Sequence, residues 1–307
     1  MGLEQVEMGE TGKKYVSIDI GGTAIKYGVI NENGEIISRN EMDTEAQKGG
    51  PAILKKVVGI VEKLSTEEKI SGVCISTAGM VDTEKGEIFY SAPLIPDYAG
   101  TSFKTVIEEK FGITCEVEND VNCAGLAESV SGAAKGSHSS LMLTIGTGIG
   151  GCFVQEGRVF HGYSNSACEV GYMHMFDSDF QTLGAASILT KKVAERKGEP
   201  SENWNGYHIF EEAKKGDEIC IRAIEEMVEI LGRGIANICY VLNPQMVVLG
   251  GGIMAQEEHL KEKIEAALKK YLVPSIACCT EIRFAYHRND AGMLGAFYHF
   301  MGKHGKG

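Results

Sequence analysis

The sequence predicts an α/β protein of two domains that arose by duplication. Its 307 residues exceed one typical hydrophobic core and suit two domains of about 150 residues each. A strand, a glycine turn and a second strand are expected over residues 15–30, and residues 141–154 repeat that plan. Strand-like and helix-like segments alternate through the rest of the chain. Two unrelated hairpins are the alternative to duplication. Two domains would leave a cleft between them.

The first half predicts a sheet with helices. Residues 34–38 continue the first hairpin, and the apolar spacing of residues 50–64 predicts a helix. Residues 69–77 predict a strand, followed by a turn in which Gly79 would let a ligand approach the backbone. Later segments alternate again, with a helix, a short strand and a small-residue helix over residues 100–111, 113–117 and 123–132.

The second half repeats this alternation. Residues 183–197 predict a helix, and residues 218–241 predict a longer one with an apolar stripe that Asn243-Pro244 stops. A buried strand begins at Met246 and runs into three glycines. The remaining segments predict a helix, a strand and a closing helix over residues 256–272, 281–285 and 290–300.

The composition excludes several classes of protein. Apolar residues make up 43% and charged residues 23%, as in soluble globular proteins. The formal net charge of −12 argues against nucleic acid or an anionic membrane as a partner, because both recruit basic surfaces. No apolar run approaches a membrane span, and the polar leader from Met1 to Lys14 lacks the core of a signal peptide. The nine cysteines, odd in number and never spaced as C-x-x-C, indicate buried thiols in a reducing compartment. We therefore expect a cytoplasmic protein.

The first hairpin turn has the features of a phosphate site. Gly21 and Gly22 supply the backbone freedom and the missing Cβ atoms of a tight turn, whose outward N–H groups suit phosphate oxygens. The Thr23 hydroxyl adds a donor, and Asp19 is placed to hold Mg²⁺ through water. The turn lacks the lysine of a P-loop, and a strand follows it instead of the helix of a Rossmann turn. An ordinary hairpin is the alternative.

Three glycine elements, at residues 21–22, 146–151 and 250–252, each end a strand and could converge on one nucleotide. Four further motifs accompany them, namely Asn119-Asp120-Val121-Asn122, Glu169-Val170-Gly171, Asn243-Pro244-Gln245 and residues 290–296. The order of the glycine elements and these motifs resembles the ROK family of the actin, hexokinase and heat-shock ATPase-like superfamily. The resemblance spans residues 15–300.

The resemblance implies a two-lobed actin-like or hexokinase-like ATPase fold of duplicated ribonuclease H-like domains. A small lobe would comprise residues 13–121 and a returning helix at residues 290–307, and a large lobe residues 122–289. It also implies an ATP-dependent kinase that transfers the γ-phosphate to the 6-hydroxyl of a sugar bound between the lobes. A homodimer is expected, both from the family and from the apolar helix near residues 219–242.

The resemblance places two sets of ligand contacts. The nucleotide and its Mg²⁺ would be bound by Asp19, Gly21, Gly22, Thr23, Lys26, Gly146, Thr147, Gly148, Gly150, Gly251 and Gly252. The sugar would contact Gly79, Asn119, Asp120, Glu169 and Tyr172.

Asp120 is the candidate general base. Phosphoryl transfer to a hydroxyl requires alignment, neutralised phosphates and removal of one proton. Asp120 fits the proton acceptor, and Asn119 beside it can hold a neighbouring hydroxyl. Capping of the helix that begins at Val121 is the alternative role of Asp120. Glu169 is similar to the family's sugar-binding glutamate, and its apolar neighbours suggest a buried setting; a surface glutamate is the alternative.

Departures from the family motif bear on the substrate. Many members place zinc beside the sugar, using a histidine three residues after the glutamate and three cysteines. Tyr172 stands at the histidine position and no cysteine lies between Cys168 and Cys220, so we expect no zinc. Leu183 stands near the place of a second sugar-facing glutamate.

Loss of these polar groups predicts an open anomeric end of the sugar site. The favoured substrates are therefore β-glucosides such as cellobiose, with free glucose or N-acetylmannosamine as alternatives.

Two other classes of protein compete with the kinase. A sugar-responsive transcriptional regulator of this family would carry a helix-turn-helix ahead of residue 15, where we expect only a short leader. An ATP-driven conformational module like actin would share the phosphate hairpins but would not need Asn119, Asp120 or Glu169.

Overall fold

The computed structural model describes residues 12–91 and 95–305, so most of the expected leader lies outside the described residues. The chain divides into two compact units. The N-terminal unit comprises Met1–Cys123 and Gly292–Gly307, and the C-terminal unit comprises Ala124–Ala291. Each unit is described by itself.

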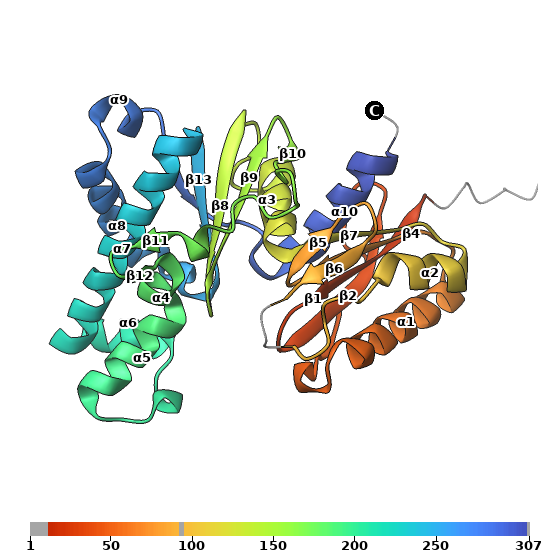
Figure 1. Cartoon of the computed structure of the whole chain (residues 1–307), viewed down its shortest axis with the longest axis horizontal. Coiled ribbons are helices and arrows are strands. Elements are labelled where there is room, and N and C mark those ends of the chain that lie inside the picture. Colours follow the sequence, from red (N-terminus) through yellow and green to blue (C-terminus); the bar gives the residue numbers. More distant parts are fainter. Residues whose placement is uncertain (1–11, 92–94, 306–307) are drawn as a thin grey trace, which may run out of the picture. The chain divides into compact units, whose positions relative to one another are not determined.

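The N-terminal unit is built on a mixed sheet in which the predicted first hairpin is central (Figure 1). Its strand order among the described residues is β3-β2-β1-β4-β7. β1 pairs antiparallel with β2 and parallel with β4, and β4 pairs parallel with β7. The strands are β1 (Lys14–Ile20), β2 (Ala24–Asn31), β3 (Asn40–Asp43), β4 (Ile70–Thr77) and β7 (Cys115–Asn119). A small ribbon of β5 (Met80–Asp82) and β6 (Glu87–Tyr90) follows β4.

Alternate residues of β1 pack on different partners, as the two-residue period of a strand requires. Val16, Ile18 and Ile20 join the core that includes α1 (Gly50–Glu67) and α2 (Phe103–Phe111). Tyr15 makes edge-to-face contacts with Phe297 and Phe300 of α10 (Ala291–His304), at centroid distances of 5.3 and 5.4 Å. The Ser17 hydroxyl donates to the Met293 carbonyl of α10 at 2.7 Å. The last helix of the chain therefore covers the sheet built by its first strand.

The C-terminal unit repeats the topology of the first sheet. Its order among the described residues is β10-β9-β8-β13-β14, with β8–β9 antiparallel and β8–β13 and β13–β14 parallel. The strands are β8 (Ser139–Ile145), β9 (Ile149–Gln155), β10 (Arg158–Val159), β13 (Met246–Gly250) and β14 (Glu281–Phe284). β11 (His174–Met175) and β12 (Ser178–Asp179) form a separate ribbon. The shared order, hairpin and parallel pairings support duplication over two unrelated hairpins.

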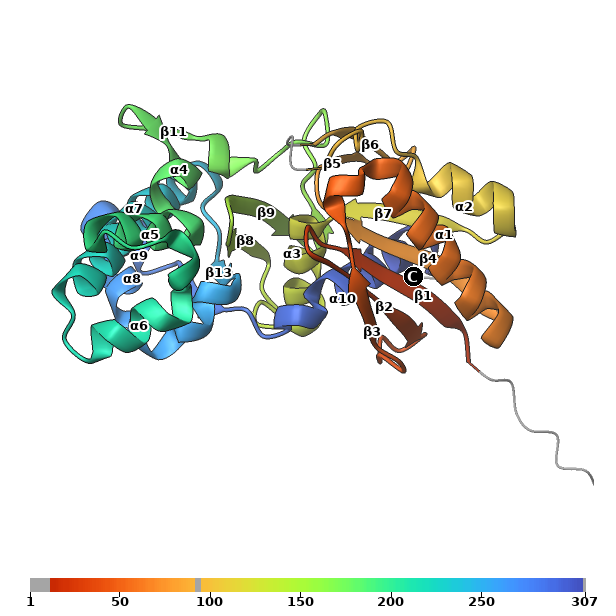
Figure 2. The same ribbon diagram turned by 90° about the horizontal axis from the view of Figure 1, so that it is seen from below.

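Helices cover both faces of the second sheet. Figure 2 shows α3 on one side and the helices from α5 to α8 on the other. The helices are α3 (Asp120–Ser131), α4 (Phe180–Gly184), α5 (Ala186–Lys197), α6 (Gly206–Lys214), α7 (Glu218–Leu242), α8 (Glu257–Tyr271) and α9 (Pro274–Ala277). The apolar stripe of α7, including Ile224, Leu231 and Ile235, lies in the core of this unit. In the described part of the chain, no helix is long and apolar enough to cross a membrane.

Two expected elements differ from the structure. The helix expected over residues 183–197 is broken at Ala185, which is extended (ψ 155°) between α4 and α5. Asp179 caps α4, accepting from the Thr182 N–H at 2.8 Å. The strand expected at residues 34–38 makes only an isolated bridge between Ile36 and Ile30, and β3 forms later.

Candidate active site

Hydrogen bonds within the turn between β1 and β2, and from buried Thr44, hold the backbone of that turn in place. The Gly21 N–H donates to the Ala24 carbonyl at 3.0 Å. Buried Thr44 donates its hydroxyl to the Gly21 carbonyl at 2.6 Å and its N–H to the Thr23 carbonyl at 2.8 Å. Neither Gly21 nor Gly22 has a left-handed φ, so the turn does not need the backbone conformation that favours glycine. The missing Cβ matters at Gly21, where such an atom would lie 3.0 Å from the Ala24 carbonyl oxygen. A Cβ on Gly22 would meet nothing within 4 Å, so its outer side is open.

Asp19 lies at the end of β1 in a crowded setting. It pairs with Lys26 in the hairpin register, and the Ser76 hydroxyl donates to its Oδ1 at 2.7 Å. A Cβ on Gly292 would lie 2.3 Å from the Asp19 carboxyl carbon, so the glycine lets α10 approach it. Burial raises the pKa of the Asp19 carboxyl, and the Ser76 hydrogen bond and the Lys26 charge oppose that shift.

Asp19 fits a magnesium ion. A buried carboxylate whose charged form is disfavoured gains stability from a nearby cation, and magnesium on a nucleotide needs only one or two carboxylates besides phosphate and water.

Asn119, not Asp120, caps α3. Its Oδ1 accepts from the N–H groups of Val121 and Asn122, at 2.9 and 3.0 Å. Its Nδ2 donates to the Gly79 carbonyl at 2.9 Å and to Asp120 Oδ1 at 3.0 Å. Both lone pairs and both N–H bonds of the amide are therefore used within the protein. Contact between Asn119 and a sugar hydroxyl stays a prediction, and it would require one of these bonds to be exchanged.

Asp120 is the first residue of α3, and its Oδ1 is held in place. That oxygen accepts from Asn119 Nδ2 and from the Val121 N–H at 2.9 Å. The side chain is partly exposed at the end of β7. The helix start thereby orients the carboxylate.

Glu118 is a supporting residue that the sequence analysis missed. Its buried Oε1 accepts from the Asn119 N–H at 2.8 Å and from Asn122 Nδ2 at 3.0 Å, and its Oε2 lies 3.3 Å from His299 Nδ1. A glutamate in a strand gives no sequence signal of a partner so distant in the chain. Gly79, in the bend between β4 and β5, has φ +97°, and a Cβ there would lie 2.9 Å from the Tyr90 carbonyl.

The second glycine turn lies in the C-terminal unit, between β8 and β9. The Gly146 N–H donates to the Gly148 carbonyl at 2.9 Å, and the Ser187 hydroxyl donates to the Thr147 carbonyl at 2.6 Å. A Cβ on Gly148 would lie 2.6 Å from Gln181 Oε1. Ser187 and Gln181 were not predicted to support this turn, because side-chain contacts to a backbone carbonyl leave no spacing pattern.

A cavity of about 290 Å³ lies at the carboxyl ends of β13 and β14. Gly251 has φ +100°, and a Cβ there would lie 2.2 Å from the Ile145 carbonyl oxygen, so only glycine fits. Gly252 has no neighbour within 4 Å of such an atom. The cavity is lined by Leu249, Gly250, Gly251, Gly252, Met254, Ala255, Glu257, Phe284, Ala285, Arg288 and Asn289. Crevices at the carboxyl ends of parallel strands are the usual ligand sites of α/β sheets.

The expectation of a buried Glu169 is wrong. The residue is exposed, although surrounding chain raises the pKa of its carboxyl through desolvation. Within the described residues the Glu169 carboxylate makes no hydrogen bond or ion pair. A Cβ on Gly171 would lie 2.3 Å from the Ile149 carbonyl, so this glycine lets the segment pack on β9. Tyr172 is 48% exposed.

The absence of the family's zinc beside the sugar stays a prediction. No group of three or more His, Cys, Asp or Glu in the described ranges is arranged to hold a metal ion. His174, two residues after Tyr172, is an exposed residue of β11.

Comparison with known proteins decides the family, because residues 15–303 match the ROK family. The chain belongs to the ROK family. One relative, an uncharacterized protein of Clostridium perfringens, is 50% identical over 93% of this chain and 97% of its own length. A β-glucoside kinase of Listeria monocytogenes is 32% identical over 94% of this chain and 97% of its own. A solved ROK hexokinase of Thermus thermophilus is 28% identical, covers 95% of this chain and 100% of its own, and has a TM-score of 0.78.

The ROK family neighbours also confirm the predicted fold class, a mixed α/β protein with the two-lobed actin-like ATPase fold. Within this ROK chain, the N-terminal unit brings together Asp19, Gly21, Gly22, Thr23 and Lys26 on one hairpin, and Gly79 with Asn119 and Asp120 through hydrogen bonds. The C-terminal unit contains the other predicted residues. Convergence of the three glycine elements on one nucleotide stays a prediction.

Proposed function

We propose that this chain is an ATP-dependent sugar kinase that phosphorylates the 6-hydroxyl of a glucose unit, preferably in β-glucosides such as cellobiose. The observation that carries the proposal is the Asp120 carboxylate, which Asn119 and the Val121 N–H orient at the start of α3. Because Asn119 performs the capping, helix capping alone does not account for the aspartate.

Asp120 is the general base of this proposal. Its carboxylate takes the proton of the sugar 6-hydroxyl while that oxygen attacks the γ-phosphorus and ADP leaves. Two donors on Oδ1 fix the orientation of the carboxylate, so little ordering remains to be done when the sugar binds. Removal of the proton from the attacking sugar hydroxyl is the only proton transfer that this reaction needs from the protein.

The nucleotide contacts come from the two hairpin turns and the cavity at Gly250–Gly252. The cavity, partly apolar through Leu249, Met254 and Phe284, suits the flat base of ATP. The open outer side of Gly22, with Thr23 and Lys26 nearby, suits phosphate oxygens. Asp19 would hold Mg²⁺ through water, and that ion supplies charge neutralisation on the transferred phosphate.

The β-glucoside preference rests on the segment around Glu169. Its carboxylate has no protein partner in the described residues and is available to sugar hydroxyls. Tyr172 exposes 48% of its surface and offers a ring on which a second sugar or an aglycone can stack. Leu183 packs against the unit's apolar core and offers no polar contact. The relative named β-glucoside kinase supports this choice.

Free hexoses are the second candidate, because a solved structural neighbour is named a hexokinase. The deciding experiment measures sugar-dependent ADP release with cellobiose, methyl β-glucoside, glucose and N-acetylmannosamine, and maps the phosphate by NMR. We expect a β-glucoside to have the highest kcat/KM and phosphate at position 6. If the kcat/KM for a free monosaccharide is at least tenfold higher than for every β-glucoside, the proposed substrate preference is wrong. If ATP is hydrolysed at the same rate with and without sugar, the protein is not a sugar kinase.

A further inference from the structure

A second cavity of the C-terminal unit lies at the opposite end of β13 and β14 from the proposed nucleotide cavity. It has a volume of about 430 Å³ and is lined by the residues that precede or begin these strands, including Gln245, Glu281 and Ile282. The nucleotide cavity is lined instead by the residues that end them. The second cavity therefore belongs to a different surface of the same sheet and is not part of the site described above.

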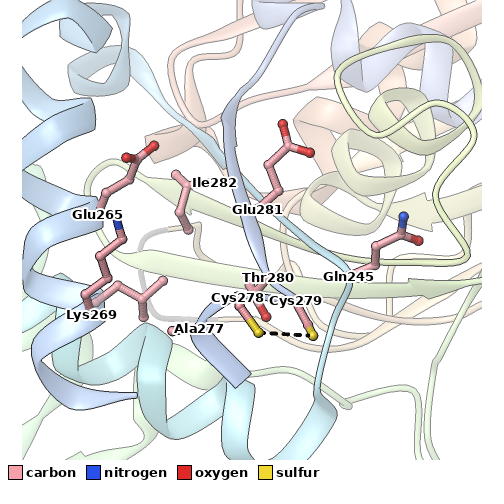
Figure 3. Close-up of a pocket in the computed structure, with 10 residues that line it drawn as sticks. Gln245, Glu265, Lys269, Ala277, Cys278, Cys279, Thr280, Glu281 and Ile282 are labelled. Atoms are coloured by element: carbon pink, nitrogen blue, oxygen red, sulfur yellow. Dashed lines mark hydrogen bonds between the residues drawn. The ribbon is translucent and has the colours of Figure 1, made fainter. Parts of the chain in front are cut away.

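Two adjacent cysteines line this cavity. Cys278 and Cys279 follow α9, both are exposed, and their Sγ atoms lie 3.6 Å apart. Figure 3 shows the two sulfur atoms side by side, joined by the only hydrogen bond drawn there. The other cysteines of the chain are buried, except for the partly buried Cys168. Among the nine cysteines, these two thiols are thus the most accessible.

The sulfur spacing matches chelation of a tetrahedral metal ion. With metal–sulfur bonds of about 2.3 Å, two vertices of a tetrahedron are about 3.8 Å apart, close to the observed 3.6 Å. A disulfide between the two residues fits less well. Adjacent Cα atoms across a trans peptide are about 3.8 Å apart, which is below the range of about 4.4–6.8 Å in ordinary disulfides. The pair can therefore bind a metal ion with less rearrangement than it needs to oxidise.

The surroundings limit the ligand set to the two sulfur atoms. Glu265 and Glu281 line the cavity and bring negative charge near it, opposed by Lys269. In Figure 3 both carboxylates point away from the sulfur atoms. Consistent with this, the described residues contain no group of three or more metal-ligating side chains. The remaining coordination positions must be filled from solution.

We propose that Cys278 and Cys279 form a bidentate thiolate site for a thiophilic divalent cation of the Zn²⁺ and Cd²⁺ class. Each thiol releases one proton to the solvent, and two metal–sulfur bonds form without any change of oxidation state. Water or a small-molecule thiol completes the coordination. Soft thiolate ligands select such ions over Mg²⁺, so the site does not compete for the kinase's cation.

The test uses the full-length, reduced, metal-free protein and Cd²⁺ as the probe. Ultraviolet thiolate-to-cadmium charge-transfer absorption reports sulfur ligation, and equilibrium dialysis gives the stoichiometry. The variants are Cys278→Ser, Cys279→Ser and, as a matched control, Cys168→Ser, which removes the other thiol that is not fully buried. Thermal unfolding without metal checks that each variant folds, which we expect because the two target residues are exposed.

We expect one Cd²⁺ per chain in the wild type and in Cys168→Ser. Either substitution in the pair should weaken binding at least about tenfold and reduce the charge-transfer band, because the chelate loses a ligand. Wild-type affinity in Cys278→Ser or in Cys279→Ser would overturn the proposal, and so would an equal loss of binding in the Cys168→Ser control. These outcomes are independent of kinase activity and of the identity of its sugar.

Discussion

The residue on which the proposed chemistry depends is Asp120, and its neighbour Asn119 supports that role. A cap is a common role for an aspartate at a helix start, and the sequence alone leaves base and cap open. In the structure, Asn119 caps the helix by accepting from two backbone N–H groups.

Glu169 is exposed, contrary to the expectation from the sequence. The small residues around it let the backbone pack on β9, and the side chain lies outside.

Asp120→Asn should abolish most turnover without unfolding the protein. The amide keeps the shape of the side chain but cannot take the proton of the sugar hydroxyl. Loss of a general base costs about 10²–10⁴-fold in rate. The steady-state kcat with ATP and the preferred sugar measures this loss of turnover. The control variant is Asp43→Asn, which removes one charge from an exposed residue of β3 in the same unit. Retention of more than about a tenth of wild-type turnover would remove Asp120 from the role of base.

Asp19→Asn should lower the activity of the protein and raise its stability at neutral pH. Burial raises the pKa of this carboxyl in the folded state, so its contribution to stability is complete below the unfolded pKa and is lost as the pH rises through the folded pKa. Above the unfolded pKa the wild type carries the free-energy cost that the raised pKa of Asp19 represents, and the amide, which does not titrate, lacks it. Asn can still accept the Ser76 hydrogen bond.

Thermal unfolding without ligands, from acidic to neutral pH, measures the effect of Asp19→Asn. The variant should be more stable than the wild type at neutral pH, with the difference shrinking in acid, and its Mg²⁺-dependent activity should fall. A variant less stable than the wild type at neutral pH would contradict the argument.

At the scale of elements, sequence patterns predict those segments whose own residues determine their conformation. Both glycine hairpins and the amphipathic helix α7 are confirmed, because alternation and helical periodicity are local signals. The break between α4 and α5 was not predictable, because Gly184 packs against Ile230 of a different helix. The same holds for Thr44 and Ser187, which tie the glycine turns by contacts that depend on tertiary structure.

The third glycine element contains a matched pair of test positions. Gly251→Ala places a side chain at φ +100° and 2.2 Å from a carbonyl oxygen, so it should lower the free energy of unfolding by about 1–3 kcal/mol or more. Gly252→Ala meets no protein atom within 4 Å. It should leave stability unchanged and raise the KM for ATP, since the added methyl group occupies the cavity wall. Denaturant unfolding and ATP kinetics of both variants separate the effects; equal losses of stability would refute this assignment.

At the scale of the whole molecule, duplication explains why two sheets share one order of strands. The helices differ between the units, because α1, α2 and α10 belong to the N-terminal unit and α4 to α9 to the C-terminal unit. The expected homodimer has less support than the sequence suggested. The apolar stripe of α7 is buried within its own unit, so it is not available as an interface. The homodimer therefore stays a prediction from the family, and light scattering of the purified protein tests it.

Phe300→Ala should destabilise the N-terminal unit selectively. The Phe300 ring contacts Tyr15, and it fills the space that the missing side chain of Gly72 leaves. Truncating a buried phenylalanine costs about 3–5 kcal/mol. Native-state hydrogen exchange should show faster opening of amides in β1 and β4, while α7 and β13 keep their protection. Uniform loss of protection over both units would show that they unfold as one.

The return of α10 to the first sheet also has a consequence for synthesis. The residues of the C-terminal unit are contiguous in the chain, so the N-terminal unit receives its covering helix only after the whole C-terminal unit has been synthesised. Until then, the face of β1 that carries Tyr15 and Ser17 lacks its partners on the nascent chain. The unit that is synthesised first is therefore completed after the second one, and a stop codon ahead of α10 would leave one face of the first sheet uncovered.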